Sequence, residues 1–68
     1  MTKVISNNIR RLRFDHDEMT QQMLADHVSV SRQTIVAIEK GKYSPSLEVA
    51  FKIADVFEQS IGEVFQYQ

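Results

Sequence analysis

The sequence predicts an all-α fold of five helices in one domain, residues 1–68, with a short antiparallel β-ribbon of the two chain ends as a candidate addition. Apolar residues recur at spacings of three and four, which is typical of helices that bury one face. Good capping residues precede these runs, and the 68 residues contain only two glycines and one proline. A chain this short is near the lower size limit for an adequate core, so its size favours a stabilising partner subunit.

The first two helices are expected on either side of a polar turn. Ser6 or Asn7 can cap a first helix, and the segment 15–18 has the composition of a solvated turn. Thr20 is a good N-cap for a second helix that extends to about residue 28. The apolar residues that we expect to face inward from these two helices are Ile9, Leu12, Met23, Leu24 and Val28.

Two longer helices are expected in the second half of the chain. Ser31 can cap a third helix that ends near Lys40, where Gly41 suits the left-handed position beyond a helix end. Ser46 can cap a fourth helix after a short loop. The inward stripe that we expect on this fourth helix consists of Leu47, Ala50, Ala54 and Phe57.

The chain ends have a different character. Ser60 and Glu63 have the spacing of a capping box, which predicts a short fifth helix. Residues 4–5 and 65–67 are rich in β-branched and aromatic side chains, so they are candidates for pairing as an antiparallel ribbon. Periodicity alone does not distinguish such strands from frayed ends.

The net charge of −1 is a weak argument against a nucleic-acid partner, but the charges are unevenly distributed. Residues 1–13 carry +4, residues 14–31 carry −4, residues 32–43 carry +2 and residues 44–68 carry −3. One face can therefore be positive while the remainder keeps the protein soluble. The absence of cysteine, of a signal peptide and of a long apolar run predicts a cytoplasmic protein without disulfides or a membrane partner.

The predicted third helix has two different faces. At 100° per residue, Ile35 and Ile38 lie on one side and must face the core. The opposite side carries an amide, two small apolar groups and a cation, which belong to Gln33, Val36, Ala37 and Lys40. Arg32 lies in the first turn. Such groups can hydrogen-bond guanine and adenine edges and contact a thymine methyl group in the DNA major groove. An ordinary surface helix with a chance polar start explains the same pattern equally well at this point.

The preceding helix favours the DNA-binding interpretation. Helices over 20–28 and 31–40 with a connection of about three residues must cross, as in a helix-turn-helix unit. Ala25 is small where the helices pass closely, and Val30 is an apolar plug for the turn. Gln21 lies in the first turn of the second helix, which is a suitable anchor for a phosphate.

Several motifs at these positions resemble the Cro/repressor-type (XRE-like) helix-turn-helix family of bacterial and phage regulators. The resemblance covers roughly residues 7–65, nearly the whole chain. The residues that carry it are Thr20-Gln21, Leu24-Ala25, Val30-Ser31-Arg32-Gln33-Thr34-Ile35, Ile38-Glu39, Gly41 and Ser44-Pro45-Ser46-Leu47-Glu48. It implies a five-helix lambda-repressor-like DNA-binding domain, usually a homodimer on palindromic operators. Repression is the expected role, because 68 residues leave no room for an activation or effector domain.

The resemblance also implies residue roles. The helix-turn-helix unit spans about residues 20–40, and the third helix reads the major groove. Residues facing the bases would be Arg32, Gln33 and Ala37, with Thr34 and Val36 near base or backbone. Residues along the phosphates would be Gln21, Ser31, Lys40, Lys42 and Tyr43. Arg13 and Glu39 resemble the structural ion pair of the family, which joins the first helix to the third.

The dimerisation region is expected at about residues 57–68, because the last helix is too short and too apolar to stand alone. The ending 65–67 looks like that of short family members whose terminal strands extend the bundle. Residues expected at the dimer surface are Phe57, Ile61, Val64, Phe65 and Tyr67. A two-fold axis would place the two third helices about 34 Å apart, one turn of DNA.

The sequence departs from the common family pattern at two points. Ser29 occupies the turn position that usually holds glycine, and a positive φ there would cost about 1–2 kcal/mol. The loop 15–19 is one residue longer than usual and acidic, and we expect it to point away from the phosphates.

An enzyme and a protein-binding module are the alternative classes of function. An enzyme is improbable, because there is no cysteine nucleophile and the serines fall mostly at cap positions. His16 lies in the string DHDE, but adjacent residues of a turn rarely converge on one ion, so we expect no metal and no cofactor. The serious alternative is an antitoxin or protein-binding helix-turn-helix module with little DNA affinity, in which Val36 and Ala37 would contact another protein. The low net charge supports this alternative.

Overall fold

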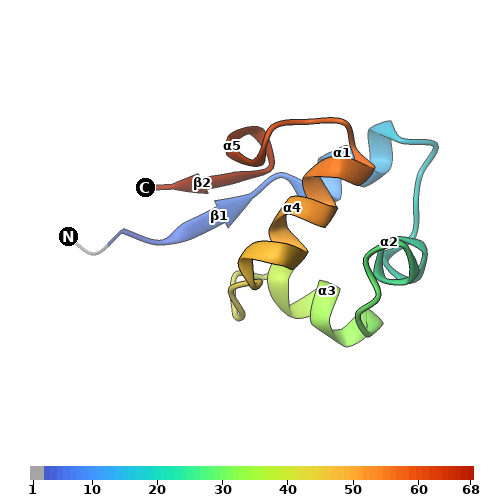
Figure 1. Cartoon of the computed structure of the whole chain (residues 1–68), viewed down its shortest axis with the longest axis horizontal. Coiled ribbons are helices and arrows are strands. Elements are labelled where there is room, and N and C mark those ends of the chain that lie inside the picture. Colours follow the sequence, from blue (N-terminus) through green and yellow to red (C-terminus); the bar gives the residue numbers. More distant parts are fainter. Residues whose placement is uncertain (1–2) are drawn as a thin grey trace.

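The computed structural model describes residues 3–68 and contains five helices and two strands in that range (Figure 1). Their order is β1 (Ile5–Asn7), α1 (Ile9–Asp15), α2 (Gln21–Val28), α3 (Arg32–Glu39), α4 (Leu47–Val56), α5 (Ile61–Val64) and β2 (Phe65–Tyr67). The five-helix fold with a terminal ribbon is therefore confirmed. Residues 1 and 2 of the domain predicted over 1–68 lie outside the described part.

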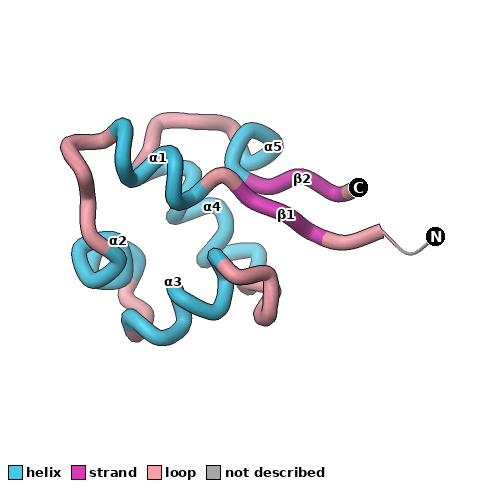
Figure 2. The backbone as a smooth tube through the Cα atoms, turned by 180° about the vertical axis from the view of Figure 1, so that it is seen from behind, coloured by secondary structure: helices cyan, strands magenta, loops and turns pink. Residues whose placement is uncertain are grey.

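The two chain ends form an antiparallel ribbon that projects from the helices, as Figure 2 shows from behind. Ile5 pairs with Tyr67 in the register of the two strands. Beyond this pair, Val4 and Gln68 exchange backbone hydrogen bonds of 2.6 and 3.0 Å. The ammonium of Lys3 lies 5.3 Å from the centroid of the Tyr67 ring, a cation–π contact that adds to the pairing.

The hydrophobic core lies between the helices and receives side chains from every one of them. Its buried members are Ile9, Met19, Leu24, Ala25, Val28, Ile35, Ile38, Ile53, Ala54, Phe57 and Val64. The core holds the helices in the relative positions shown in Figure 1 because burial of apolar surface is the main driving force of folding.

Two apolar residues do not face inward as expected. Met23 is 49 % exposed, because Leu24, Ala25 and Val28 define the inward stripe of α2 and Met23 lies on its far side. Leu47 is 69 % exposed, because it is the first residue of α4 and projects beyond the core that begins one turn later. Both side chains add apolar surface to the outside of the molecule.

Serine and threonine caps define the starts of the three longest helices that follow the first turn. Thr20, Ser31 and Ser46 each accept a hydrogen bond from the backbone N–H three residues further on, at 3.0, 3.1 and 3.2 Å. These three caps were predicted and are confirmed. At α5, Ser60 is the N-cap residue, but its hydroxyl donates to Glu63 at 3.2 Å, so the expected capping box does not form.

The first helix begins later than the sequence suggested. Asn8 is its N-cap residue, and Ser6 belongs to β1. The Asn8 backbone N–H donates to Val64 O at 2.9 Å, which fixes the start of α1 to the end of α5. Pairing of the chain ends therefore decides where α1 begins.

Left-handed backbone conformations end the second and third helices. Gly41 has φ +73° just beyond α3, as predicted. Ser29 has φ +61° at the end of α2, so the position where the family usually has glycine does adopt the conformation that disfavours side chains. A cost of about 1–2 kcal/mol follows at Ser29.

Candidate nucleic-acid interface

The two faces of α3 are as the sequence predicted. Ile35 and Ile38 are buried, whereas Arg32 and Gln33 are exposed in the first turn. Val36 and Ala37 are half-buried on the outer side, and the exposed Lys40 follows the last turn. The outer side of α3 is therefore open to a large ligand at its amino-terminal end.

The polar groups of Thr34 are less available to an outside partner than those of its neighbours. Its hydroxyl is hydrogen-bonded to that of Ser31 at 2.9 Å, and its backbone N–H donates to the same Ser31 oxygen. These bonds satisfy the start of α3 internally. The Thr34 methyl group remains for contact with an outside partner.

A tight turn joins α2 to α3. Ala25 is fully buried, and its carbonyl accepts a hydrogen bond from Val30 N–H at 3.0 Å. Val30 is half-buried against the core, as its expected role as a plug requires. Figures 1 and 2 both show α2 and α3 next to each other at the end of the molecule opposite the ribbon.

A carboxylate at the end of α3 connects three helices. Arg13 Nε donates to Glu39 Oε2 at 2.7 Å and Arg13 Nη2 donates to Glu39 Oε1 at 3.0 Å, so the ion pair that the resemblance implied is present. The two side chains are only 14 % and 9 % exposed. Gln21 Nε2 also donates to Glu39 Oε1, at 3.2 Å. The side-chain amide nitrogen of Gln21 is therefore already engaged, which leaves its backbone N–H at the helix start for an anion.

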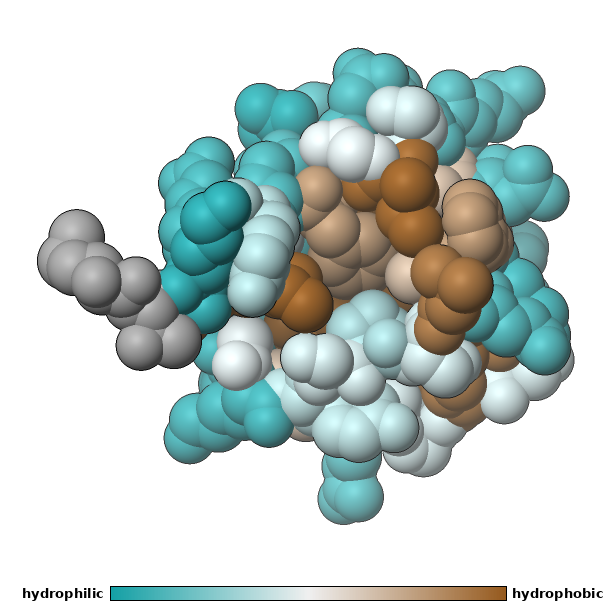
Figure 3. Space-filling view, turned by 60° about the vertical axis from the view of Figure 1, so that its left-hand side comes forward, coloured by the Kyte–Doolittle hydropathy of each residue, from teal (hydrophilic) through white to brown (hydrophobic). Residues whose placement is uncertain are grey.

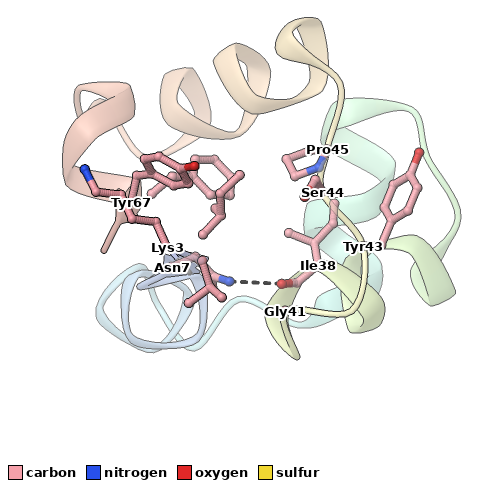
Figure 4. A pocket seen from close by; sticks show the side chains of 11 residues that line it. Lys3, Asn7, Ile38, Gly41, Tyr43, Ser44, Pro45 and Tyr67 are labelled. Carbon is pink, nitrogen blue, oxygen red and sulfur yellow. Dashed lines mark hydrogen bonds between the residues drawn. The ribbon is translucent and has the colours of Figure 1, made fainter. Parts of the chain in front are cut away.

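Asn7 positions α3 in a way that sequence reasoning missed. Its Nδ2 donates to Ile38 O at 2.9 Å, the bond drawn in Figure 4, and its Oδ1 accepts from Ile9 N–H at 3.1 Å. One half-buried side chain thus links β1, the start of α1 and the last turn of α3. The partners Asn7 and Ile38 are 31 residues apart, so no local pattern could have indicated this bond.

The segment after α3 presents cations and an aromatic ring. The backbone N–H of Lys42 donates to Ala37 O at 2.9 Å, which closes the helix. Lys42 and Tyr43 are both exposed directly beyond this closure. Figure 4 shows Tyr43 on the opposite side of a pocket from Tyr67, so its ring is directed away from the ribbon.

A cleft separates α1 from the outer side of α3, and we call it the α1–α3 cleft. Its lining includes Arg10, Glu18, Gln21, Val36 and Lys40. We expected the acidic loop to point away from the phosphates, but Glu18 lines the same cleft as Gln21 and Lys40, two of the residues predicted to lie along phosphates. The left-handed conformations of Asp17 and Glu18 turn the loop back toward the start of α2.

An apolar depression lies on the side of the molecule that carries the ribbon. We call this surface the apolar face, and it is lined by Ile5, Pro45, Leu47, Ala50, Ile61 and Phe65. Figure 3 looks toward this side and shows apolar side chains gathered around a hollow. Of the residues predicted at the dimer surface, Ile61 and Phe65 line this depression.

Two residues expected at the dimer surface lie in the core instead. Phe57 is 5 % exposed and Val64 is 0 % exposed. The reason is that α5 packs against α4, so the inward side of the short helix is already covered within one chain. Ile61 and Phe65 are half-buried and Tyr67 is exposed, so these three remain accessible in part.

The residues that the structure describes contain no group of three or more histidine or acidic side chains that could hold a metal ion. His16 contacts the edge of the Phe57 ring instead, with ring centroids 5.8 Å apart. Among the same residues, no helix has the length and apolar character needed to span a bilayer.

Two crossing helices, a tight left-handed turn and an exposed polar side on the second helix define a helix-turn-helix module. A family model described as "Helix-turn-helix" matches residues 9–64. The chain therefore belongs to this family, the Cro/C1-type helix-turn-helix transcriptional regulators.

Named relatives are transcription regulators rather than enzymes. An uncharacterised HTH-type transcriptional regulator of Methanocaldococcus jannaschii is 50 % identical over 64 residues, which cover 94 % of this chain and 96 % of that protein. The cryptic phage CTXphi transcriptional repressor RstR of Vibrio cholerae is 36 % identical over 61 residues, which cover 90 % of this chain and 54 % of that protein. The crystal structure of transcriptional regulator VanUg superimposes with a TM-score of 0.80 at 25 % identity and covers all of this chain and 89 % of the other.

Proposed function

We propose that the protein is a sequence-specific regulator that binds double-stranded DNA as a homodimer, recognises a palindromic operator and represses transcription. The observation that carries the proposal is the two-sided α3, which has a buried isoleucine stripe and an exposed polar amino-terminal end. The protein has no catalytic role in this proposal. The family membership and the repressor RstR among the relatives support it.

The exposed end of α3 has suitable chemistry for the major groove. Arg32 can donate two hydrogen bonds to guanine O6 and N7, and Gln33 can pair with adenine N6 and N7. Ala37 is small enough for close approach, and Val36 and the Thr34 methyl group can contact thymine methyl groups. The base-reading residues are then Arg32, Gln33 and Ala37, supported by Thr34 and Val36.

Phosphate contacts surround this base-reading surface. The residues proposed for them are Gln21, Ser31, Lys40, Lys42 and Tyr43. Gln21 would act through its backbone N–H at the positive end of α2, since its amide nitrogen is bonded to Glu39. The lysines would act as point charges and Tyr43 through its exposed hydroxyl.

The homodimer would form through the apolar face. This surface differs in part from the dimer surface that the sequence predicted. Ile61 and Phe65 remain in it, while Ile5 and Leu47 take the places of the two buried residues and the exposed Tyr67 lies beyond its lining. Pro45, in the loop that follows α3, lines the same depression. A palindromic operator requires that the two-fold axis through this face set both α3 helices on one side of the dimer.

A protein-binding module, such as an antitoxin, is the second candidate. The net charge of −1 favours it, as do the exposed Phe14 and Met23, which lie outside the proposed DNA and dimer surfaces. These side chains are available to an accessory protein in either case.

Selection of bound sequences from a random pool of duplex DNA tests the proposed function. We expect enrichment of an inverted repeat with half-site centres about one helical turn apart, and an affinity that falls steeply with salt concentration. If no sequence is enriched and binding does not respond to salt, the protein-binding module becomes the better explanation.

A further inference from the structure

The α1–α3 cleft opens beside the base-reading surface. Val36 and Lys40 border it from α3, and Gln21 borders it from the first turn of α2. Arg10 forms the border on the side of α1. A ligand strand that meets Gln21 and Lys40 therefore passes directly in front of Arg10.

Two carboxylates also line the cleft, and one of them is neutralised by an ion pair whereas the other is not. Glu39 is paired with Arg13, so that the floor of the cleft is nearly neutral. Glu18 is exposed on the rim and forms no ion pair with the residues described. The unpaired charges around the cleft are those of Arg10, Lys40 and Glu18.

Arg10 has a free guanidinium group. It is exposed, and within residues 3–68 it takes part in no ion pair and in no side-chain hydrogen bond. Arg13, one turn later on the same helix, has all of its side chain committed to Glu39 and to Met19 O. Arg10 is thus the arginine of this cleft that an outside anion can engage.

We propose that Arg10 is a further DNA-backbone contact, which binds a phosphate in the α1–α3 cleft and extends the footprint from α2 and α3 onto α1. This inference rests on the proposed function. The guanidinium fork binds phosphate oxygens through two parallel hydrogen bonds, so Arg10 would also orient the duplex relative to α1. Glu18 on the same rim repels that phosphate and weakens the contact.

Neighbouring residues offer matched controls for both charges. Arg11 is exposed like Arg10 but does not line the α1–α3 cleft; it lines a neighbouring depression with Asn8 and Phe14, which Arg10 also borders. Asp17 precedes Glu18, has the same left-handed conformation and does not line the cleft. Each pair changes the total charge equally and differs only in location.

The experiment compares salt-dependent DNA binding of the full chain and four variants. The probe is a fluorescein-labelled duplex of random sequence, titrated by fluorescence anisotropy at several NaCl concentrations. We expect Arg10→Gln to weaken binding about tenfold at low salt, as the loss of a charge-assisted hydrogen bond implies, and to reduce the salt slope by about 0.9. Arg11→Gln should leave the slope unchanged.

Substitution of the acidic residues should change the affinity for DNA in the opposite direction. We expect Glu18→Gln to tighten binding about threefold, as removal of one partly screened repulsion implies, and Asp17→Asn to have a smaller effect. A gain of affinity cannot arise from unfolding. The Glu18→Gln measurement therefore still tests the proposal if an arginine variant is destabilised.

Equal losses from Arg10→Gln and Arg11→Gln would show only general attraction between charges and would overturn the assignment of Arg10. An unchanged Arg10→Gln variant, or equal gains from Glu18→Gln and Asp17→Asn, would overturn it as well. If the unaltered protein does not bind the duplex at all, the proposed function fails, and this outcome is distinct because no variant is needed to see it.

Discussion

The α2–α3 unit and the ribbon end of the molecule are held together in different ways. In α2–α3, the caps at Thr20 and Ser31 and the bond from Val30 to Ala25 all connect residues close in sequence. At the ribbon end, Asn8 bonds to Val64 and β1 pairs with β2 at the other end of the chain. The unit that reads DNA in our proposal is thus locally encoded, whereas the proposed dimer surface exists only after the chain ends have met.

Glu39 and Asn7 connect these two regions to each other. Glu39 ties the end of α3 to α1 and α2, and Asn7 ties the same end to the ribbon. The position of α3 therefore depends on both regions. Substitutions in each region can separate their contributions.

Loss of the Glu39 carboxylate should have the largest effect. Glu39→Ala leaves the mostly buried guanidinium of Arg13 without its partner, and we expect the free energy of unfolding to fall by about 3 kcal/mol. Urea denaturation followed by circular dichroism measures the change. Glu48→Ala is the control, because its pair with Lys52 is exposed and should contribute at most about 0.5 kcal/mol. Equal losses in the two variants would contradict the special role of Glu39.

Base reading by the α2–α3 unit is tested at the exposed end of α3. Arg32→Ala should weaken binding to the selected operator by about 2 kcal/mol and relax base preference at one position in each half-site. Lys42→Ala is the matched control, since loss of a phosphate contact should weaken binding to all sequences alike and lower the salt slope by about 1. Arg32 would lose its assigned role if its substitution changed affinity without changing base preference.

Dimerisation by the ribbon end is tested at an exposed residue of the apolar face. Leu47→Ser should weaken the dimer by about 2 kcal/mol while leaving the monomer folded, because Leu47 contributes little to the core of one chain. Sedimentation equilibrium measures the association. Met23→Ser serves as control, because Met23 is also exposed but lies on α2. A dimer that survives Leu47→Ser unchanged would place the interface elsewhere.

The link between the regions is tested at Asn7. Asn7→Ala removes the donor to Ile38 O and the acceptor for Ile9 N–H, and we expect a loss of about 1.5 kcal/mol in stability. Amide hydrogen exchange should show faster opening of the last turn of α3 together with the ribbon. Asn8→Ala is the comparison, since the Asn8 side chain bonds only to the exposed Glu63 carbonyl. Unchanged exchange at the end of α3 would argue against the link.

The smallest effect is expected at the turn between α2 and α3. Ser29→Gly should raise the free energy of unfolding by about 1 kcal/mol, because glycine adopts φ +61° without steric cost. Thermal unfolding measures the gain. Glu58→Gly tests the same principle at the end of α4, where φ is +54°. A lower melting temperature for Ser29→Gly would show that relief of backbone strain is outweighed there by the greater flexibility of glycine in the unfolded chain.

Much of the fold followed from local patterns. Thr20, Ser31 and Ser46 were recognisable as caps because each bonds to a backbone group three residues away. Ile35 and Ile38 were recognisable as the inner side of α3 because helical geometry fixes which residues share a face. Sequence reasoning failed at helix ends, where Phe57 and Val64 are covered by neighbouring elements and Leu47 projects beyond the core. It also failed at Met23, on the far side of α2.

The amino-acid sequence alone therefore determined the helices, the caps of α2, α3 and α4, the two sides of α3 and the family. Tertiary structure alone decided that Asn7 holds the end of α3, that Glu18 and Arg10 share a cleft, and that an apolar face forms between the ribbon and α4. The physical reason is the separation in sequence of the interacting residues, because caps and helical faces depend on neighbours within one or two turns. The other features need backbone and side chains that are brought together only when the core is buried.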